Sequence, residues 1–514
     1  MNTSLITLEI AVVVLGLIIL LADLWMPTEH KRKLGYVAAG GLSIIFAASF
    51  FTPMSWSSES FSTVHEHTTV IKIIKSFGDM LVVDSLAIFF KQFFILAAIF
   101  VLLMAIEFAD RIQTGISEFY ALILFALSGM MFAASANDFV LVFVALELVS
   151  ISFYILNSFQ RNRLASLEAG IKYLMLSALS AAFLVFGIAL IFGTATTTNF
   201  SEIQTLLQST PALAIKPIFL LGLLFVVVGL GFKIAAFPFQ VWAPDVYQGS
   251  PAPATAFLAV GSKAAGIVLL LRVLFSAVPE VAQHWNKLLM ILAAITILYG
   301  NLCAIPQRNL KRLFGYSSIA NAGYLLLGFV PLSQAGTSAI LYYLAGYLFS
   351  VIATFTVICI ITRQNESEDV TILAGLSQRS PLLAAAMTLA MVSLAGIPPL
   401  AGFFGKFLLL KAIVEQAPVN PAYYFVAAIA IIGVVISLYY YFGIIRAIYW
   451  SKETTDLSPI LISTPTKISL LVCVAGMFFL GLFPNRLLEK TTEVAKVLHP
   501  KSSLIEIQKE ARHP

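Results

Sequence analysis

The chain has 514 residues, of which 60% are hydrophobic and only 11% are charged, with a formal net charge of +5. Soluble globular domains carry about 25% charged residues, so this composition excludes a soluble protein and indicates an all-α polytopic membrane protein. The small positive charge lies mostly in short segments between apolar runs, which is typical of membrane orientation signals and not of nucleic-acid binding.

Long apolar runs predict that the chain crosses the membrane many times. A spanning helix needs about 20 apolar residues, and we expect about fourteen such helices in one membrane domain covering 1–514. The predicted spans are 4–26, 34–52, 82–106, 118–135, 138–158, 168–193, 214–240, 253–276, 286–304, 312–330, 337–362, 382–411, 422–449 and 466–485. The remaining residues, 487–514, are mostly polar and are expected to form a short tail.

Lys and Arg residues between the predicted spans indicate the orientation of the chain. Loops after odd-numbered spans carry most of these cations, for example in 31–33 and 308–312. Loops after even-numbered spans carry only Lys72, Lys75 and Lys287. Because cytoplasmic loops are enriched in Lys and Arg, we expect the odd-numbered loops in the cytoplasm and both termini on the outer side.

Several ionisable residues lie inside predicted spans. Glu147, Lys233, Lys263 and Lys406 each have apolar residues on both sides. A charge at the bilayer centre costs about 2.5–3.5 kcal/mol on insertion scales, and such residues usually face a bundle interior or a wet cavity on an ion path. Lys172, near the start of its span, is a further candidate, although its long side chain could instead reach the interface.

These residue types together predict a proton relay. Burial favours the neutral amine of a lysine, whereas a nearby carboxylate favours the ammonium. A glutamate–lysine pair can therefore act as a switch, because separating the two groups favours release of the proton. Neutral lysines further along the chain can accept that proton. The alternative, that the buried charges only specify helix packing, is less favourable because apolar packing would cost less.

Prolines predict broken helices beside two of these lysines. Pro238 follows Lys233, while Pro398 and Pro399 precede Lys406 within a glycine-rich stretch. Proline removes a backbone hydrogen-bond donor and interrupts a helix. Unwound backbone at membrane depth is tolerated only where it is buried in protein or lines water, so both breaks indicate hydrated surroundings for the neighbouring lysine.

The order of the two breaks predicts an internal symmetry. They lie in the seventh and twelfth predicted spans, which are five helices apart. Because five is odd, corresponding helices would cross the membrane in opposite directions, as in inverted repeats. We expect one five-helix repeat in 118–276 and a second, inverted one in 286–449, each with one broken helix.

Cysteine and histidine placement argues against a redox centre in this chain. Cys303, Cys359 and Cys473 lie singly in apolar runs, and no predicted span contains a histidine. Iron–sulfur clusters and haem need such ligands in suitable arrangements. We therefore expect no cofactor and no metal to be bound here.

The stretches that contain the breaks resemble a known family. The chain is similar to the antiporter-like membrane subunits of respiratory complex I, and most of all to subunit N (subunit 2) of the bacterial proton-translocating NADH–quinone oxidoreductase. The resemblance covers about 165–410. It is carried by "SLEAGIKYLMLSA", "GLGFKIAAFPFQVWAPDVYQGSPAPATAFLAVGSKAA", "NLKRLFGYSSIANAGYLL", "YLAGYLFS" and "LAGIPPLAGFFGKF".

This resemblance implies roles for the candidate residues. Glu147 and Lys233 match the switch pair of the family, and Lys263 matches its central relay lysine. Lys406 matches the residue toward the outer exit, and Lys172 matches a lysine that is usual in the sixth helix of this subunit. The resemblance therefore implies proton translocation coupled to electron transfer from NADH to quinone.

The resemblance also implies a setting. NADH, FMN, iron–sulfur clusters and quinone are expected in other subunits. The expected partners are a neighbouring antiporter-like subunit, small membrane subunits and membrane lipids, with no nucleic acid. The implied location is the cell inner membrane, with multiple crossings and periplasmic termini. An Mrp-type cation/proton antiporter subunit remains the alternative.

One helix departs from the family pattern. The tenth helix of the family often reads "YSSISHLG", whereas residues 316–323 here read "YSSIANAG". Asn321 therefore stands where a histidine is common. An asparagine side chain can hydrogen-bond but cannot titrate near neutral pH, so we expect water to bridge this part of a relay.

Overall fold

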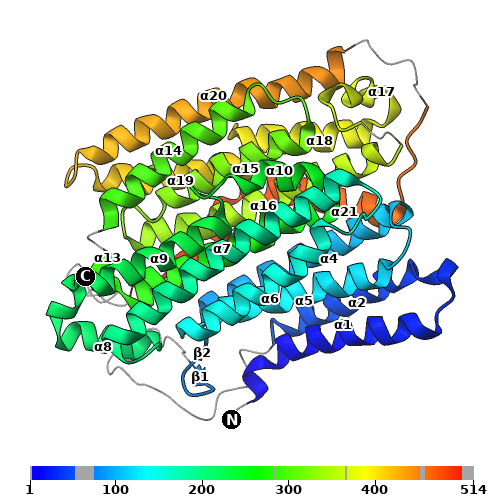
Figure 1. Ribbon diagram of the computed structural model, residues 1–514. Coiled ribbons are helices and arrows are strands. Elements are labelled where there is room, and N and C mark those ends of the chain that lie inside the picture. Colours follow the sequence, from blue (N-terminus) through cyan, green and yellow to red (C-terminus); the bar gives the residue numbers. More distant parts are fainter. Residues whose placement is uncertain (1–2, 52–73, 283–284, 365–366, 452–457, 500–514) are drawn as a thin grey trace.

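The computed structural model describes residues 3–51, 74–282, 285–364, 367–451 and 458–499. Figure 1 shows long helices that lie side by side with roughly aligned axes, as expected for a bundle that crosses a membrane. Within these ranges, 11 helical segments are long and apolar enough to span a bilayer. The chain is therefore a mostly helical, membrane-embedded protein.

The long apolar helices form most of the bundle. They are α1 (Thr7–Trp25), α4 (Ser85–Phe108), α5 (Ile116–Ala134), α6 (Phe139–Asn157), α7 (Leu164–Ala195), α9 (Pro217–Ile234), α14 (Asn286–Ala304), α16 (Gln334–Gln364), α20 (Ala422–Trp450) and α21 (Thr464–Leu482), together with a composite helix made of α11 (Ala252–Phe257), a π-helical turn (Leu258–Ser262), α12 (Lys263–Arg272) and a second π-helical turn (Val273–Ala277).

Shorter elements complete the chain. They are α2 (Lys33–Ala48), α8 (Phe200–Ser209), α10 (Trp242–Gly249), α13 (Pro279–Ala282), α15 (Leu310–Leu327), α17 (Leu376–Arg379), α18 (Pro381–Ala395), α19 (Ala401–Gln416), α22 (Pro484–Lys496), and short 3-10 turns at Thr3–Ile6, Thr28–His30, Ala109–Arg111, Pro211–Ile215 and Val370–Leu373. Length and hydropathy alone therefore do not confirm the predicted count of fourteen spans, because α2, α15, α18 and α19 fall short on one or the other.

Two connecting segments add detail to the predicted organisation. A short hairpin interrupts the mostly helical chain, because β1 (Ile74–Ser76) pairs antiparallel with β2 (Leu81–Val83). The hairpin lies where the span predicted for 82–106 begins, and the sequence interpretation did not include it. The predicted polar tail also begins as the helix α22, whose buried Thr491, Val494 and Ala495 pack toward the bundle. Residues 500–514 lie outside the described part.

Capping side chains fix where several helices begin. Asp84 accepts a hydrogen bond from the backbone N–H of Ala87 at the start of α4, and Asp138 does the same for Val140 at the start of α6. Asn309 caps α15 through the N–H of Arg312. Such caps satisfy backbone donors that have no partner within the helix.

The centre of the bundle lies around the composite helix and α16. Within the composite segment Ala252–Ala277, the most apolar stretch is wholly buried, and α16 is almost as enclosed. By contrast, most of α1 is exposed. Figure 1 shows this helix at the periphery of the bundle. A buried functional site is therefore expected along the enclosed helices.

Candidate functional site

Both predicted helix breaks are present, and each leaves a short non-helical segment. The helix α9 ends at Ile234, and Ala235 adopts a left-handed backbone with φ +59° before α10 begins at Trp242. The helix α18 ends at Ala395, and Gly396 has φ +85°. A left-handed residue just beyond a helix is a common way to end it. The lysines near these breaks therefore lie beside interrupted backbone.

Lys233 lies in the last turn of α9 and is almost completely buried. Its Nζ donates to Ser150 Oγ of α6 at 2.7 Å and to Ser177 Oγ of α7 at 2.8 Å. The ring of Tyr173 lies 5.7 Å from this nitrogen. The ammonium or amine is thus surrounded by hydroxyl and aromatic groups from two other helices.

Glu147 lies on α6 one turn before Ser150 and is only partly buried. It attracts Lys233 electrostatically, yet no ion pair within 4.0 Å joins the two among the described residues. The predicted pair therefore shares a region without direct contact. Ser150, on the same helix as Glu147, accepts a hydrogen bond from Lys233 Nζ through its hydroxyl oxygen.

Lys263 begins α12 directly after the π-helical turn and is 1% exposed. Its Nζ donates to the carbonyl oxygen of Ser318 on α15 at 2.5 Å, and it also contacts Ser318 Oγ. The hydroxyls of Tyr247 and Tyr347 lie 3.0 Å and 3.1 Å from the same Ser318 Oγ. Lys263 is therefore linked through one serine to a group of hydroxyls.

A glycine allows the helices of Lys233 and Lys263 to approach closely. Gly266 lies one turn after Lys263, and a Cβ atom there would lie 3.2 Å from Lys233 Cβ and 2.8 Å from a methyl carbon of Ile234. A larger residue would force these helices apart. The small residue thus brings the first two lysines of the predicted relay into neighbouring helix turns.

Lys406 lies on α19 and points back into the second break. Its Nζ donates to the carbonyl oxygens of Leu394 at 2.7 Å and Ala395 at 3.4 Å, which end α18. The ring of Tyr324 lies 4.7 Å from the same nitrogen. The last carbonyls of a helix have no partner within it, so the break itself supplies the polar surroundings of Lys406.

A small cavity lies between the surroundings of Lys263 and those of Lys406. It is lined by Ser317, Ser318 and Tyr347, among others, and by Leu394, whose carbonyl binds Lys406. Its interior has room for about one water molecule. The cavity therefore borders Ser318, which binds Lys263, and Leu394, whose carbonyl binds Lys406.

Asn321 takes part in a neighbouring group of polar side chains. Tyr343 donates its hydroxyl hydrogen to Asn321 Oδ1 at 2.6 Å, and Asn321 Nδ2 donates to Ser317 Oγ at 3.4 Å. Ser317 Oγ is also 2.6 Å from the hydroxyl of Tyr441. The asparagine is thus held in a hydroxyl network next to the cavity that Ser317 lines.

Lys172 is separate from the other candidates. It lies on α7, 40% exposed, and its Nζ is 2.6 Å from both Asp245 of α10 and Glu168 of α7. Arg312 contacts the second oxygen of Asp245 at 2.5 Å. Lys172 therefore belongs to a partly exposed ionic group with Asp245 and Glu168, whereas Lys233 binds Ser150 and Ser177.

Two buried ion pairs were missed by the sequence interpretation. Lys91 of α4 binds Glu9 of α1 at 2.7 Å, and Arg272 of α12 makes a two-pronged contact with Asp84 at 2.8 Å and 3.0 Å. All four side chains are at most 3% exposed. Glu9, Lys91 and Arg272 stand inside predicted spans, so the same search for ionisable residues could have found them.

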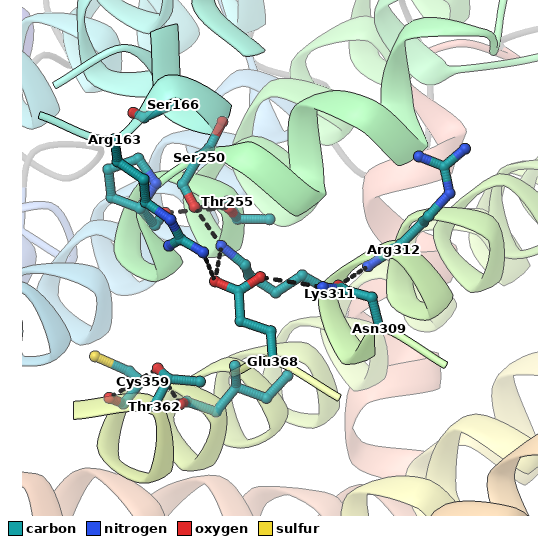
Figure 2. Close-up of polar contacts among 12 residues, drawn as sticks. Arg163, Ser166, Ser250, Thr255, Asn309, Lys311, Arg312, Cys359, Thr362 and Glu368 are labelled. Atoms are coloured by element: carbon teal, nitrogen blue, oxygen red, sulfur yellow. Dashed lines mark hydrogen bonds and ion pairs between the residues drawn. The ribbon is translucent and has the colours of Figure 1, made fainter. Parts of the chain in front are cut away.

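A third buried group, shown in Figure 2, gathers around Glu368. Its Oε1 is 2.7 Å from Arg163 and 3.0 Å from Lys311, and Asn309 donates to its Oε2 at 3.3 Å. Burial raises the pKa of the Glu368 carboxyl, but Lys311 and Arg163 outweigh that effect and hold it below its usual range. Glu368 is therefore an anion that joins two cations.

The described residues contain no group of three or more His, Cys, Asp or Glu side chains placed to hold a metal ion. The polar groups around Lys233, Lys263 and Lys406 are instead hydroxyls and carbonyls. This set of groups can bind, release and pass protons.

Comparison with known proteins places this architecture in a family. The family model described as NADH:quinone oxidoreductase/Mrp antiporter, TM matches residues 136–437. NADH-quinone oxidoreductase subunit N of Trichlorobacter lovleyi is 39% identical, with 97% of this chain and 98% of the relative covered.

Solved structures agree with this assignment. A chain of respiratory complex I from Thermus thermophilus with bound aureothin is 31% identical, with a TM-score of 0.75, and the match covers 94% of this chain and 99% of that one. A chain of the Mrp complex from Dietzia sp. shares the fold, with a TM-score of 0.80 at 19% identity over 98% and 99% of the two chains. The chain belongs to the subunit N family of NADH-quinone oxidoreductase, a membrane-bound oxidoreductase complex.

Proposed function

We propose that this chain conducts protons across the membrane through Glu147, Lys233, Lys263 and Lys406. The observation that carries the proposal is the chemistry around the three lysines. Each is buried, and each binds neutral hydroxyl or carbonyl oxygens instead of a carboxylate. Such oxygens accept hydrogen bonds from an amine as well as from an ammonium, so a lysine can change protonation state without losing its partners.

The relay starts at the partly buried Glu147 and the nearby Lys233. Approach of the carboxylate favours the ammonium of Lys233, and separation favours proton release. The absence of a direct ion pair among the described residues supports a separated state of this switch. Lys263 is the next acceptor, since Gly266 brings its helix against α9.

Transfer from Lys263 to Lys406 uses water in this proposal. The cavity lined by Ser317, Ser318, Tyr347 and Leu394 supports one bridging water site, and Asn321 orients hydroxyls beside it. Lys406 then releases the proton toward the outer side. Lys172 remains a candidate for an auxiliary role, because its salt bridges lie apart from the three buried lysines.

The wider setting is also part of the proposal. We infer fourteen spanning segments in all, with inverted repeats in 118–276 and 286–449, because the two breaks lie in α9–α10 and α18–α19. Both termini lie in the periplasm of a cell inner membrane. Neighbouring membrane subunits contact this chain, and NADH, FMN, iron–sulfur clusters and quinone bind to other subunits of the complex.

The decisive experiment is NADH-driven proton uptake into inverted membrane vesicles. Wild type is compared with Glu147→Ala and Lys263→Met, and with Lys411→Met as a matched control, because Lys411 is a mostly exposed lysine on α19 that binds Glu415. We expect both relay variants to lose most of their uptake and coupled quinone reduction while NADH oxidation by an artificial acceptor persists. The control should pump normally.

Assembly of the complex is checked in the same membranes. Normal uptake by an assembled Lys263→Met variant would make the buried charges structural and would refute the relay. Sodium-dependent exchange in membranes without a redox substrate would instead favour a cation/proton antiporter, which shares this fold.

A further inference from the structure

The short helix α10, next to the candidate relay, is separated from the helices before and after it in the chain. It spans Trp242–Gly249, between the break after Ile234 and the non-helical Ser250–Pro251. Because helical hydrogen bonding is interrupted on both sides, the backbone alone does not fix its position. Its contacts with other helices, chiefly α7 and α15, must do so.

One of these contacts reaches the relay directly. The hydroxyl of Tyr247 on α10 lies 3.0 Å from Ser318 Oγ, and Lys263 donates to the same serine. All three side chains are buried. A displacement of α10 would therefore move a hydrogen-bonding partner of the group that holds Lys263.

The helix α10 is also held by the first turn of α15. Lys311 Nζ donates to the carbonyl oxygen of Ser250 at 2.8 Å. The next residue, Arg312, contacts Asp245 at 2.5 Å and Gln248 at 3.1 Å. Two consecutive cations on α15 thus hold α10, Arg312 at Asp245 in its first turn and at Gln248, and Lys311 at the C-capping Ser250; of the two only Lys311 is fully buried.

Lys311 needs a counter-charge to remain in that position. Glu368 supplies it at 3.0 Å and is itself bound by Arg163, which precedes the first residue of α7, at 2.7 Å. Figure 2 shows Arg163 and Lys311 meeting at the same oxygen of Glu368, with Ser250 on the other side of the Lys311 amine. A buried cation that loses its partner is strongly unfavourable, so removing the carboxylate would drive Lys311 to deprotonate or to turn away from Ser250.

We propose that Glu368 and Lys311 are positioning residues that hold α10 against α15, so that Tyr247 stays on Ser318 beside Lys263. The pair acts through α10 and does not itself carry the transported proton. This inference rests on the proposed function, because the position of α10 matters for transport only if Lys263 is part of the relay.

The test combines transport with a direct measurement of α10. Val246 is buried on α10 and makes no side-chain hydrogen bond, so Val246→Cys reports exposure of the helix. This cysteine is introduced after alanine replaces the natural cysteines 303, 359 and 473. A membrane-impermeant maleimide is added to inverted vesicles, and labelling and NADH-driven proton uptake are measured on the assembled complex.

We expect Glu368→Gln to increase the labelling rate of the cysteine several-fold and to lower proton uptake several-fold. Glu368→Asp, which keeps the charge, should restore part of both. Glu415→Gln is the matched control, since Glu415 is an exposed carboxylate that pairs with Lys411 one turn away on the same helix. It should change neither measurement.

Unchanged labelling or unchanged uptake in Glu368→Gln would overturn the positioning role. If Glu368→Gln does not assemble, the double variant Glu368→Gln with Lys311→Met removes both buried charges and leaves only Arg163, whose side chain is 34% exposed, without its carboxylate. It should assemble with an exposed α10. The two proposals fail separately, because normal pumping by Lys263→Met refutes the relay, whereas unchanged labelling in Glu368→Gln refutes the hold on α10.

Discussion

Six cations that are at most 4% exposed, among the described residues, fall into two classes that differ in their partners. One class binds only neutral oxygens, and the other binds a carboxylate directly. The first class is Lys233, Lys263 and Lys406; the second is Lys91 with Glu9, Arg272 with Asp84, and Lys311 with Glu368.

This difference separates groups that can change charge from groups that cannot. A carboxylate in direct contact favours the charged form of its partner and fixes it. Hydroxyl and carbonyl oxygens leave both forms of a lysine with hydrogen bonds. We therefore assign transport to the first class and structural integrity to the second, and the following experiments test that division.

The largest expected effect is on stability, from breaking a structural pair. Arg272→Leu leaves Asp84 buried without its cation and should cost about 3–5 kcal/mol. The variant should show a lowered unfolding midpoint and a poor yield of assembled complex. Arg446→Leu, at an exposed position of α20, is the control and should change stability by less than about 0.5 kcal/mol. Equal destabilisation by both changes would count against the structural class.

The next effect comes from converting a transport lysine into a fixed ion pair. Ser318→Asp places a carboxylate next to Lys263, which should keep the lysine charged and reduce NADH-driven proton uptake about tenfold, or about 1.4 kcal/mol. Ser318→Asn, of similar size but uncharged, should retain much more uptake. If the two variants pump equally well, Lys263 does not need to release its proton.

The smallest effect concerns the pH dependence of the Glu368 group. The pKa of Glu368 is lowered in the folded chain from a reference value of 4.5. The pair therefore stabilises the fold fully above that reference value, and the contribution is lost as the pH falls through the folded pKa. Melting temperatures of wild type and Glu368→Gln should differ most near neutral pH and converge in acid. If the difference in melting temperature stays constant across this pH range, the ion pair of Glu368 is not its source.

Local features of the sequence were enough to predict much of this protein. The length of apolar runs predicts a membrane bundle, and the prolines at 238, 398 and 399 predict the two interruptions. The ionisable residues in the middle of spans identify Lys233, Lys263 and Lys406 as buried. Each of these inferences depends on neighbours within one or two helical turns, where chain geometry leaves little choice.

The partners of these residues depended on the tertiary structure. Ser150 lies 83 residues from Lys233, Ser318 lies 55 residues from Lys263, and Asp84 lies 188 residues from Arg272. Nothing local distinguishes a lysine that will meet a serine from one that will meet a carboxylate. That choice is made by which helices pack together, because packing decides which buried cations meet a carboxylate and which meet only neutral oxygens, the feature on which the proposed relay rests.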